Sequence, residues 1–206
     1  MDPEHTTRDF FMSEHSFLSA AYWQDRYHSA DTGWDLGAVS PPLKAYIDHL
    51  EDKDLRILIP GAGHAYEAEY LLRLGFTNVH VIDLAPEPLV TLKNRCPEFP
   101  ENHLHVGDFF AFEGEYDLIL EQTLFCAIDP SLRDDYARKS AELLADGGKL
   151  CGLLFNRSFE AGPPFGGKKE EYEVLFAPYF STIQLEVCTN SIAARAGTEL
   201  FIQMTK

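Results

Sequence analysis

From residue 55 onward, the chain alternates short apolar runs with longer stretches of helix-forming residues. The runs Arg56–Pro60, Val79–Leu84, Tyr116–Glu121 and Lys149–Phe155 are largely apolar, a pattern typical of strands buried on both faces of a parallel sheet. The segment His103–Phe109 contains a further predicted strand. The pattern therefore predicts a sheet built mostly of buried strands.

Helix-forming segments separate these runs. We predict one helix over residues 65–74, ending at Gly75, and a second that begins at Pro86. Two more are predicted over residues 130–144 and 168–177. Because strands that alternate with helices form βαβ units, the sheet should be mostly parallel.

The end of the chain breaks this alternation. Residues 181–189 and 199–205 both have a strand pattern, and the loop between them is too short for a crossover helix. These two strands should therefore pair antiparallel. An α/β sheet of seven strands, mostly parallel with one antiparallel strand and with helices on both faces, resembles the Rossmann-like class I methyltransferase fold more than a dinucleotide dehydrogenase. A fold alone does not establish an activity.

The segment before the sheet has a different character. Residues 8–28 have a helical pattern rich in aromatic residues, and a turn at residues 31–33 precedes Trp34. We predict one domain over residues 1–206, in which residues 51–206 form the α/β core. Residues 1–50 form an N-terminal aromatic helical extension that covers the ligand site.

Composition narrows the partners and the compartment. The chain has 17 Lys and Arg against 33 Asp and Glu, a formal net charge of −16, which argues against nucleic acid and anionic membranes as partners. No signal peptide or apolar span is predicted. The four cysteines form no C-x-x-C motif, so reduced thiols in a cytoplasmic protein are the simpler interpretation.

The main candidate for chemistry is a glycine loop at residues 61–65, directly after the first predicted strand. Glycines at this position let the backbone approach a ligand at the carboxyl end of the sheet. Asp83 ends the second strand 22 residues after Gly61, near the offset at which an acid meets a ribose. Tyr66 occupies the third glycine position of a dinucleotide loop, so the segment fits G-x-G-x-G better, with Ala65 in the last place.

A second acid and a group of aromatic residues add to this site. Asp108 follows the third strand, where it can accept a hydrogen bond from an adenine amine while Phe109 covers the ring; alternatively, Asp108 caps a helix. Trp23 and Trp34 are the two tryptophans of the chain, and aromatic faces attract cations such as a sulfonium. Ordinary core packing is the alternative explanation for them.

Several motifs together resemble the thiopurine, thiol and halide methyltransferase superfamily, whose members use S-adenosylmethionine. The resemblance extends from Trp23 to Glu199. The motifs that carry it are Trp34-Asp35-x-Gly37, Ile59-Pro60-Gly61-Ala62-Gly63, Tyr116-Asp117-Leu118-Ile119, Phe125-Cys126-Ala127-Ile128, Gly162-Pro163-Pro164-Phe165 and Arg195-x-Gly197-x-Glu199.

The resemblance implies S-adenosylmethionine as cofactor, S-adenosylhomocysteine as product, and no metal. It also implies which residues bind the cofactor: the aromatic residues, the loop glycines, the ribose acid and the adenine contacts. The aromatic residues are Trp23, Tyr27 and Trp34, and the loop glycines are Gly61 and Gly63. The ribose acid is Asp83, and the adenine contacts are Asp108 and Phe109. Glu121 and Gln122 follow the fourth strand, where the family approaches the transferred methyl group.

The expected reaction is methylation of a small soft nucleophile, with a thiol as the preferred class. Arg195 is the candidate for orienting an anionic acceptor, although a salt bridge to Glu199 explains it equally well. Glu121 is a candidate base and equally a candidate partner of the cofactor ammonium. Plant halide and thiol methyltransferases carry Tyr where this chain has Gln122, a departure that argues against halide methylation. Cys126, in an apolar setting, is interpreted as packing rather than as a nucleophile.

Other functions stay open at this point. The same fold would serve halide or thiopurine methylation, or a module that binds the cofactor without turnover. A nicotinamide-dependent oxidoreductase is disfavoured by Tyr66 and by the closing antiparallel pair. The expected partner is a small-molecule acceptor, and a monomer is the default for this family.

Overall fold

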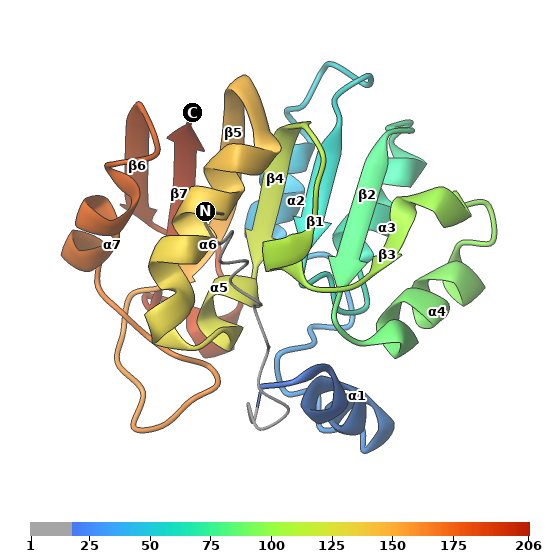
Figure 1. The fold of residues 1–206 in the computed structure, drawn as a ribbon, viewed down its shortest axis with the longest axis horizontal. Helices are drawn as coiled ribbons and strands as arrows, with labels where there is room; N and C mark the ends of the chain where they lie inside the picture. The colour runs from blue at the N-terminus through green and yellow to red at the C-terminus, as the bar shows by residue number, and fades with distance from the viewer. Residues whose placement is uncertain (1–17) are drawn as a thin grey trace, which may run out of the picture.

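The computed structural model describes residues 18–206, so the part of the predicted N-terminal helix before Leu18 lies outside the described residues. Seven strands form one sheet in the order β3-β2-β1-β4-β5-β7-β6 (Figure 1). The strands are β1 (Ile57–Pro60), β2 (Val79–Asp83), β3 (Leu104–Val106), β4 (Tyr116–Gln122), β5 (Leu144–Phe155), β6 (Thr182–Val187) and β7 (Glu199–Thr205).

Strand β7 alone runs antiparallel to both of its neighbours, which confirms the predicted α/β fold with one antiparallel strand. The sequence predicted the pairing of the last two strands but not that β7 would insert between β5 and β6. Strand β6 is consequently an edge strand and is half-exposed, whereas alternate residues of β7 are buried. Strand β5 begins at Leu144, five residues before the predicted strand, and the added residues lie next to a register irregularity between β4 and β5.

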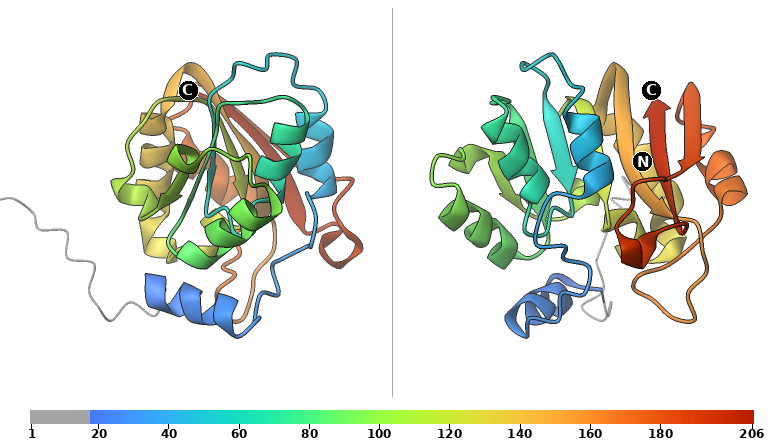
Figure 2. Two further views of the ribbon diagram at one scale, coloured as in Figure 1. Left: turned by 90° about the vertical axis from the view of Figure 1, so that its right-hand side faces the viewer. Right: turned by 180° about the vertical axis from the view of Figure 1, so that it is seen from behind.

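Helices cover both faces of the sheet (Figure 2). The helices are α1 (Ala20–His28), α2 (Pro41–Ile47), α3 (Tyr66–Arg73), α4 (Pro86–Arg95), α5 (Leu124–Ala127), α6 (Arg133–Leu143) and α7 (Lys169–Phe176), with 3₁₀ turns η1 (Glu101–His103), η2 (Phe109–Ala111), η3 (Pro130–Leu132) and η4 (Ala193–Arg195). Helices α2 and α5 were not predicted, because helices of seven and four residues are too short to show a period.

Two hydrophobic cores lie on opposite faces of the sheet. Leu58 of β1 packs in the core that α6 and α7 close, whereas its neighbours Ile57 and Ile59 pack in the core that α2, α3 and α4 close. Successive strand residues point to opposite faces. Because both faces are covered, the parallel strands are apolar almost throughout, which is the pattern that the sequence showed.

The functional region follows from this topology. Strands β2, β1 and β4 are neighbouring and parallel, so the loops after Pro60, Asp83 and Gln122 meet at one edge of the sheet. Figure 1 shows α1 below that edge. None of the helices between residues 18 and 206 is long and apolar enough to cross a membrane.

Candidate active site

A cleft of about 620 Å³ opens where β1, β2 and β4 end. Its walls are mostly apolar, with a few charged groups among them. Seven of the predicted site residues line it: Trp23, Tyr27, Trp34, Gly61, Asp83, Asp108 and Arg195. Gly63 lies directly behind this wall, whereas Phe109, Glu121 and Gln122 have other surroundings, described below.

The glycine loop adopts left-handed backbone angles at three of its positions. Gly61 and Gly63 have φ values of +57° and +51°, and Ala65 has +54°. A β-carbon at Gly61 would lie 2.8 Å from the β-carbon of Leu124, so this position needs glycine for space as well as for conformation. Ala65, in the last glycine position of the motif, takes the strained conformation that glycine would adopt freely.

Asp83 connects the end of β2 to this loop. One carboxylate oxygen accepts a hydrogen bond from the Gly63 amide at 3.0 Å, and the other accepts from the Ala85 amide at 2.9 Å. Burial raises the pKa of Asp83, although both amide donors oppose that shift. Each oxygen still has a lone pair, and the side chain lines the cleft, so Asp83 can accept hydrogen bonds from ligand hydroxyl groups.

The residues after β3 show one correction to the sequence analysis. Asp108 caps η2 by accepting from the Phe110 amide at 3.0 Å, as the alternative interpretation expected, and it also lines the cleft. The prediction that Phe109 covers a ligand ring is wrong, because Phe109 is buried in the core with its ring 5.3 Å from that of Tyr136. Phe110 lines the cleft instead. The tight 3₁₀ turn after Asp108 sends the first aromatic inward and the second outward.

Aromatic residues from the N-terminal segment form one side of the cleft. The Trp34 ring lies edge-on to Trp23 at 5.5 Å and to Tyr27 at 5.7 Å, measured between centroids. The Arg26 guanidinium lies 5.0 Å from the Trp34 ring centroid. This indole therefore makes a cation–π contact within the protein, which fixes Trp34 against helix α1.

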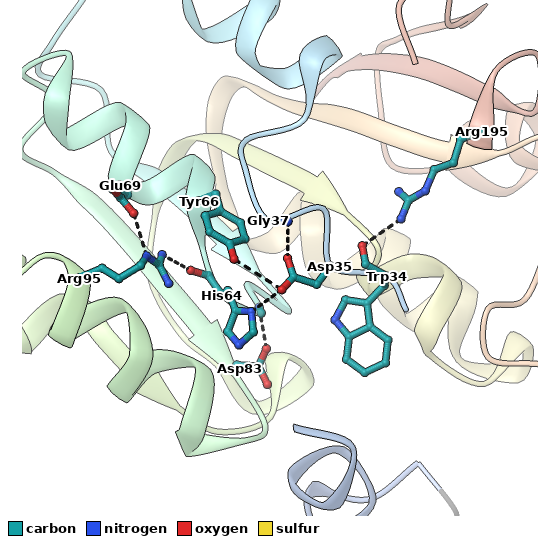
Figure 3. A network of polar contacts seen from close by, with 10 residues as sticks. Trp34, Asp35, Gly37, His64, Tyr66, Glu69, Asp83, Arg95 and Arg195 are labelled. Atoms are coloured by element: carbon teal, nitrogen blue, oxygen red, sulfur yellow. Dashed lines mark hydrogen bonds and ion pairs between the residues drawn. The ribbon is translucent and has the colours of Figure 1, made fainter. Parts of the chain in front are cut away.

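The segment after Trp34 is held against the glycine loop (Figure 3). His64 Nδ1 lies 2.7 Å from Asp35 Oδ2, and the Gly37 amide donates to Asp35 Oδ1 at 2.8 Å. On the other side, the Arg195 guanidinium donates to the Trp34 carbonyl oxygen at 3.0 Å. The aromatic segment is thus fixed to both the loop after β1 and the loop before β7.

Arg195 makes the ion pair that the sequence offered as one interpretation, and it also lies where the predicted role toward an acceptor would require it. It forms an ion pair with Glu199 at 3.4 Å, and it lines the cleft with a side chain that is 12% exposed. Its carbon Cζ also lies 5.7 Å from the centroid of the Phe155 ring. Since guanidinium has five N–H donors, these contacts leave donors for an acceptor in the cleft.

Glu121 belongs to the core and not to the cleft, so the structure contradicts its assignment as a base or as a partner of the cofactor. The side chain is fully buried, with one carboxylate oxygen accepting from the Phe125 amide at 3.0 Å and the other from the Tyr136 hydroxyl at 2.5 Å. Burial raises the pKa of Glu121 to about 7. Side chains alternate along a strand, and this one points to the α6 face.

Gln122 points to the opposite face and lines a second cavity of about 40 Å³ next to the cleft. The walls of this cavity also include Asp35, His64 and Glu67. Gln122 Oε1 is buried and has no hydrogen-bond partner among residues 18–206. A buried acceptor without a donor is costly unless a ligand or water supplies the donor.

Thr123 lies between the two cavities and lines both, as does Trp34. Its φ of +76° is rare for a β-branched residue, and sequence reasoning gave no signal for it. Cys126 also lines the cleft, but burial raises its pKa to about 12, so it remains a thiol at neutral pH.

Phe155, Pro163 and Pro164 also line the cleft and add apolar surface to it. The two prolines were noted only as part of a family motif, since their sequence neighbourhood gives no sign of the cleft. In the described part of the chain, no group of three or more His, Cys, Asp or Glu side chains is placed to hold a metal ion.

Comparisons with known proteins agree with this geometry. A sequence model of the thiopurine S-methyltransferase family matches residues 18–200. The chain is 29% identical to probable thiol methyltransferase 2 of Arabidopsis thaliana, over 94% of this chain and 88% of that protein. It is 26% identical to thiocyanate methyltransferase 1 of Brassica oleracea, over 86% of this chain and 81% of that protein.

A solved structure shows the same fold at low sequence identity. The 1,6-didemethyltoxoflavin N1-methyltransferase of Burkholderia thailandensis, solved with S-adenosylhomocysteine and its substrate, superposes with a TM-score of 0.67. The match covers 91% of this chain and 86% of that one at 18% identity. This likeness establishes the class I methyltransferase fold.

Proposed function

The chain belongs to the thiopurine S-methyltransferase family of S-adenosylmethionine-dependent methyltransferases, and from that premise we propose that it methylates a small soft nucleophile, with a thiol as the acceptor class. The observation that carries the proposal is the convergence of Asp83, Asp108 and the Trp34 ring on one cleft at the ends of β1, β2 and β4. Carboxylates suit the hydroxyl and amine donors of a nucleoside, and an indole face suits a sulfonium.

The residues present fit this cofactor. Asp83 would accept from the ribose hydroxyls, and Asp108 with Phe110 would hold the adenine. Gly61 lets the backbone approach the ligand without a clashing side chain. The partnerless Gln122 Oε1 would accept from the ammonium group in the smaller cavity, where the neighbouring carboxylates also favour a cation.

For the aromatic residues of the N-terminal segment, we propose the cation-binding role that the sequence predicts. Trp23, Tyr27 and Trp34 would surround the positively charged sulfur, an attraction of about 0.5–2 kcal/mol for each ring face in contact with a cation. Residues 18–50 would thereby act as the cover of a single methyltransferase domain, whose core is residues 51–206.

When bound, S-adenosylmethionine supplies a methyl group activated by a positive sulfur. Transfer of this methyl group to the lone pair of the acceptor sulfur would leave the electron pair of the broken bond on the cofactor sulfur, and the thiol proton would pass to solvent. Alignment of the two reactants by the cleft walls would supply about 7–11 kcal/mol of the barrier.

Arg195 and the apolar walls of the cleft favour a thiolate as acceptor. A thiol with a pKa of about 8.5 is partly ionised at neutral pH, and a nearby guanidinium increases that fraction. Phe155, Pro163 and Pro164 leave an apolar surface for the carbon part of a small acceptor. Cys126 has no place in this chemistry, because its raised pKa keeps it protonated.

Isothermal titration calorimetry with S-adenosylmethionine and S-adenosylhomocysteine tests the cofactor site. We expect both to bind, and Asp83→Ala to weaken binding by more than about tenfold, because a charged acceptor for hydroxyl groups is lost. Asp146→Ala, which removes an exposed acid outside the cleft, should leave affinity unchanged. No binding at near-millimolar ligand, or equal affinity of Asp83→Ala, would contradict the assignment.

The acceptor is tested by methyl transfer from labelled cofactor to a panel of thiols, a thiopurine, thiocyanate and iodide. We expect the specificity constant to be higher for a small thiol or sulfide than for iodide. A higher value for iodide would reverse this order. Binding of the cofactor with no product from any acceptor would favour the alternative of a binding module without turnover.

A further inference from the structure

The cleft and the smaller cavity meet at a junction that two residues share. Trp34 and Thr123 line both spaces, from opposite parts of the chain. The smaller cavity has a mixed wall, in which the carboxyl groups of Asp35 and Glu67 and the partnerless Gln122 Oε1 lie among apolar residues. The larger cleft combines mostly apolar walls with the carboxylates of Asp83, Asp108 and Asp129.

If the ligand is S-adenosylmethionine, as the proposed function requires, it has a zwitterionic amino-acid end and a nucleoside end joined by a sulfonium, and these match the two spaces in this order. Its amino-acid end would occupy the smaller cavity and its nucleoside end the larger cleft, and the charged sulfur would then lie at the junction. The residues that border both spaces, Trp34 and Thr123, would therefore flank the sulfonium and its methyl group.

The backbone of Thr123 is strained at this junction. Its φ and ψ of 76° and −15° lie in the left-handed region, which is unfavourable for a β-branched residue by about 1–2 kcal/mol. Glycine would take the same conformation without that cost, yet the chain has threonine. Backbone strain of this kind is retained where the side chain makes a contact that a strain-free glycine could not make.

The hydroxyl of Thr123 is oriented by its own backbone. Oγ1 donates to the Gln122 carbonyl oxygen, at 2.5 Å. A hydroxyl has one proton, so this bond leaves Oγ1 only as an acceptor toward any further partner. An oxygen that can only accept favours a positively polarised group and offers nothing to an anion.

We propose that Thr123 is the positioning residue at the junction, whose hydroxyl oxygen accepts the polarised C–H groups next to the cofactor sulfonium and so directs the methyl group toward the acceptor end of the cleft. Contacts of this kind are individually weak, but they are stronger to the C–H groups beside a positive sulfur than to those of the neutral product, which has also lost the methyl group. Thr123 would therefore discriminate between S-adenosylmethionine and S-adenosylhomocysteine.

Three substitutions separate this role from packing. Thr123→Val keeps the size and the β-branch and removes the oxygen, Thr123→Ser keeps the oxygen and removes the branch, and Thr123→Gly removes both and relieves the backbone strain. Calorimetry measures the affinities for S-adenosylmethionine and S-adenosylhomocysteine, and steady-state kinetics with a thiol measures kcat and the KM of the acceptor.

We expect Thr123→Val to weaken S-adenosylmethionine binding about threefold to fivefold while S-adenosylhomocysteine binding changes less than twofold. Its kcat should fall about tenfold or more at an unchanged acceptor KM, because the methyl group is no longer directed toward the bound acceptor. Thr123→Ser should restore both quantities toward those of the natural chain. Thr123→Gly should show the loss of Thr123→Val together with an equal or higher unfolding midpoint.

The outcomes are distinguishable from a failure of the proposed function. If the natural chain binds neither ligand, the proposed function fails and the inference with it. If the natural chain binds and turns over, but Thr123→Val weakens both ligands equally or neither, Thr123 only packs and the inference is overturned. If Thr123→Val does not fold, the same two affinities are measured for Thr123→Gly. Equal changes in the affinities for S-adenosylmethionine and S-adenosylhomocysteine would again overturn the inference.

Discussion

Replacing Glu121 by glutamine removes the one carboxyl of β4 that the fold holds in its core. The natural side chain accepts hydrogen bonds from the Phe125 amide and from the Tyr136 hydroxyl, and it is fully buried. Glutamine retains an oxygen for the amide and presents a nitrogen to the tyrosine. Any cost of this exchange in packing or hydrogen bonding is the same at every pH, whereas the cost of burying a charge is not.

The magnitude follows from the raised pKa of Glu121. Burial raises the pKa of Glu121 in the folded protein from 4.5 to about 7. Between these two pH values the folded state therefore retains a proton that the unfolded state has lost. Stability that is present below pH 4.5 is therefore lost as the pH rises toward 7 and stays lost above it. A difference of about 2.5 pKa units corresponds to about 3 kcal/mol. The neighbouring Tyr136 hydroxyl does not ionise in this range, because burial raises its pKa well above 10.

Urea unfolding of the natural chain and of Glu121→Gln at pH 5 and pH 8 measures this effect. The free energy of unfolding of the variant, relative to the natural chain, should increase by about 2–3 kcal/mol between the two pH values. A relative stability that does not change with pH would show that Glu121 ionises normally in the fold, and the reasoning about its burial would be refuted.

The same variant tests where Glu121 acts. Because its carboxylate lies outside the cleft, kcat and the cofactor affinity of Glu121→Gln should stay within about threefold of the natural chain once the protein is folded. A loss of a hundredfold in kcat in a protein with native stability would return Glu121 to the chemistry as a base.

Two further predictions concern the glycine loop and a histidine cluster. Gly61→Ala should lower the free energy of unfolding by about 2–4 kcal/mol in urea titrations, because its β-carbon would lie 2.8 Å from the Leu124 β-carbon at an unfavourable φ. The control Gly37→Ala has a φ of +70° but open space around the new β-carbon, so it should cost only about 1 kcal/mol. Equal costs for the two variants would refute the steric argument. Burial and two neighbouring histidines lower the pKa of His80 from 6.5 to about 4, so the unfolded state takes up this proton first and stability falls as the pH drops from 6.5 to 4. His80→Gln should reduce that fall by about 1–2 kcal/mol, allowing for partial exposure, and an identical pH dependence in both proteins would contradict it.

The sequence alone was sufficient for the fold class and for most of the strands and longer helices. Strands buried on both faces must be apolar throughout, so β1, β2, β4 and the second half of β5 were visible as runs in the chain. Glycines directly after β1 and an acid at the end of β2 follow from the same geometry, because the carboxyl ends of parallel strands meet at one edge. These are local consequences of chain pattern, and the structure places Gly61 and Asp83 in one cleft wall as expected.

Tertiary structure decided which of two adjacent residues faces the ligand space. Glu121 and Gln122 are both polar at the end of β4, and a sheet covered on both faces gives no sign in the sequence of which side holds a cavity. Packing of α6 against one face enclosed Glu121 with Tyr136, and the other face left Gln122 in the smaller cavity. In the same way, the 3₁₀ turn capped by Asp108 buried Phe109 and exposed Phe110 to the cleft.

Long-range order was equally beyond the sequence. The insertion of β7 between β5 and β6 depends on which edge the last strand finds, and strand pattern specifies only that a strand forms. The contact of Arg195 with the Trp34 carbonyl joins residues 161 positions apart, and no spacing rule relates them. Periodicity and turn chemistry thus determined the elements and the edge where the site lies, because these depend on near neighbours in the chain. The orientation of each side chain at that edge was decided only by the packing of helices on both faces of the sheet.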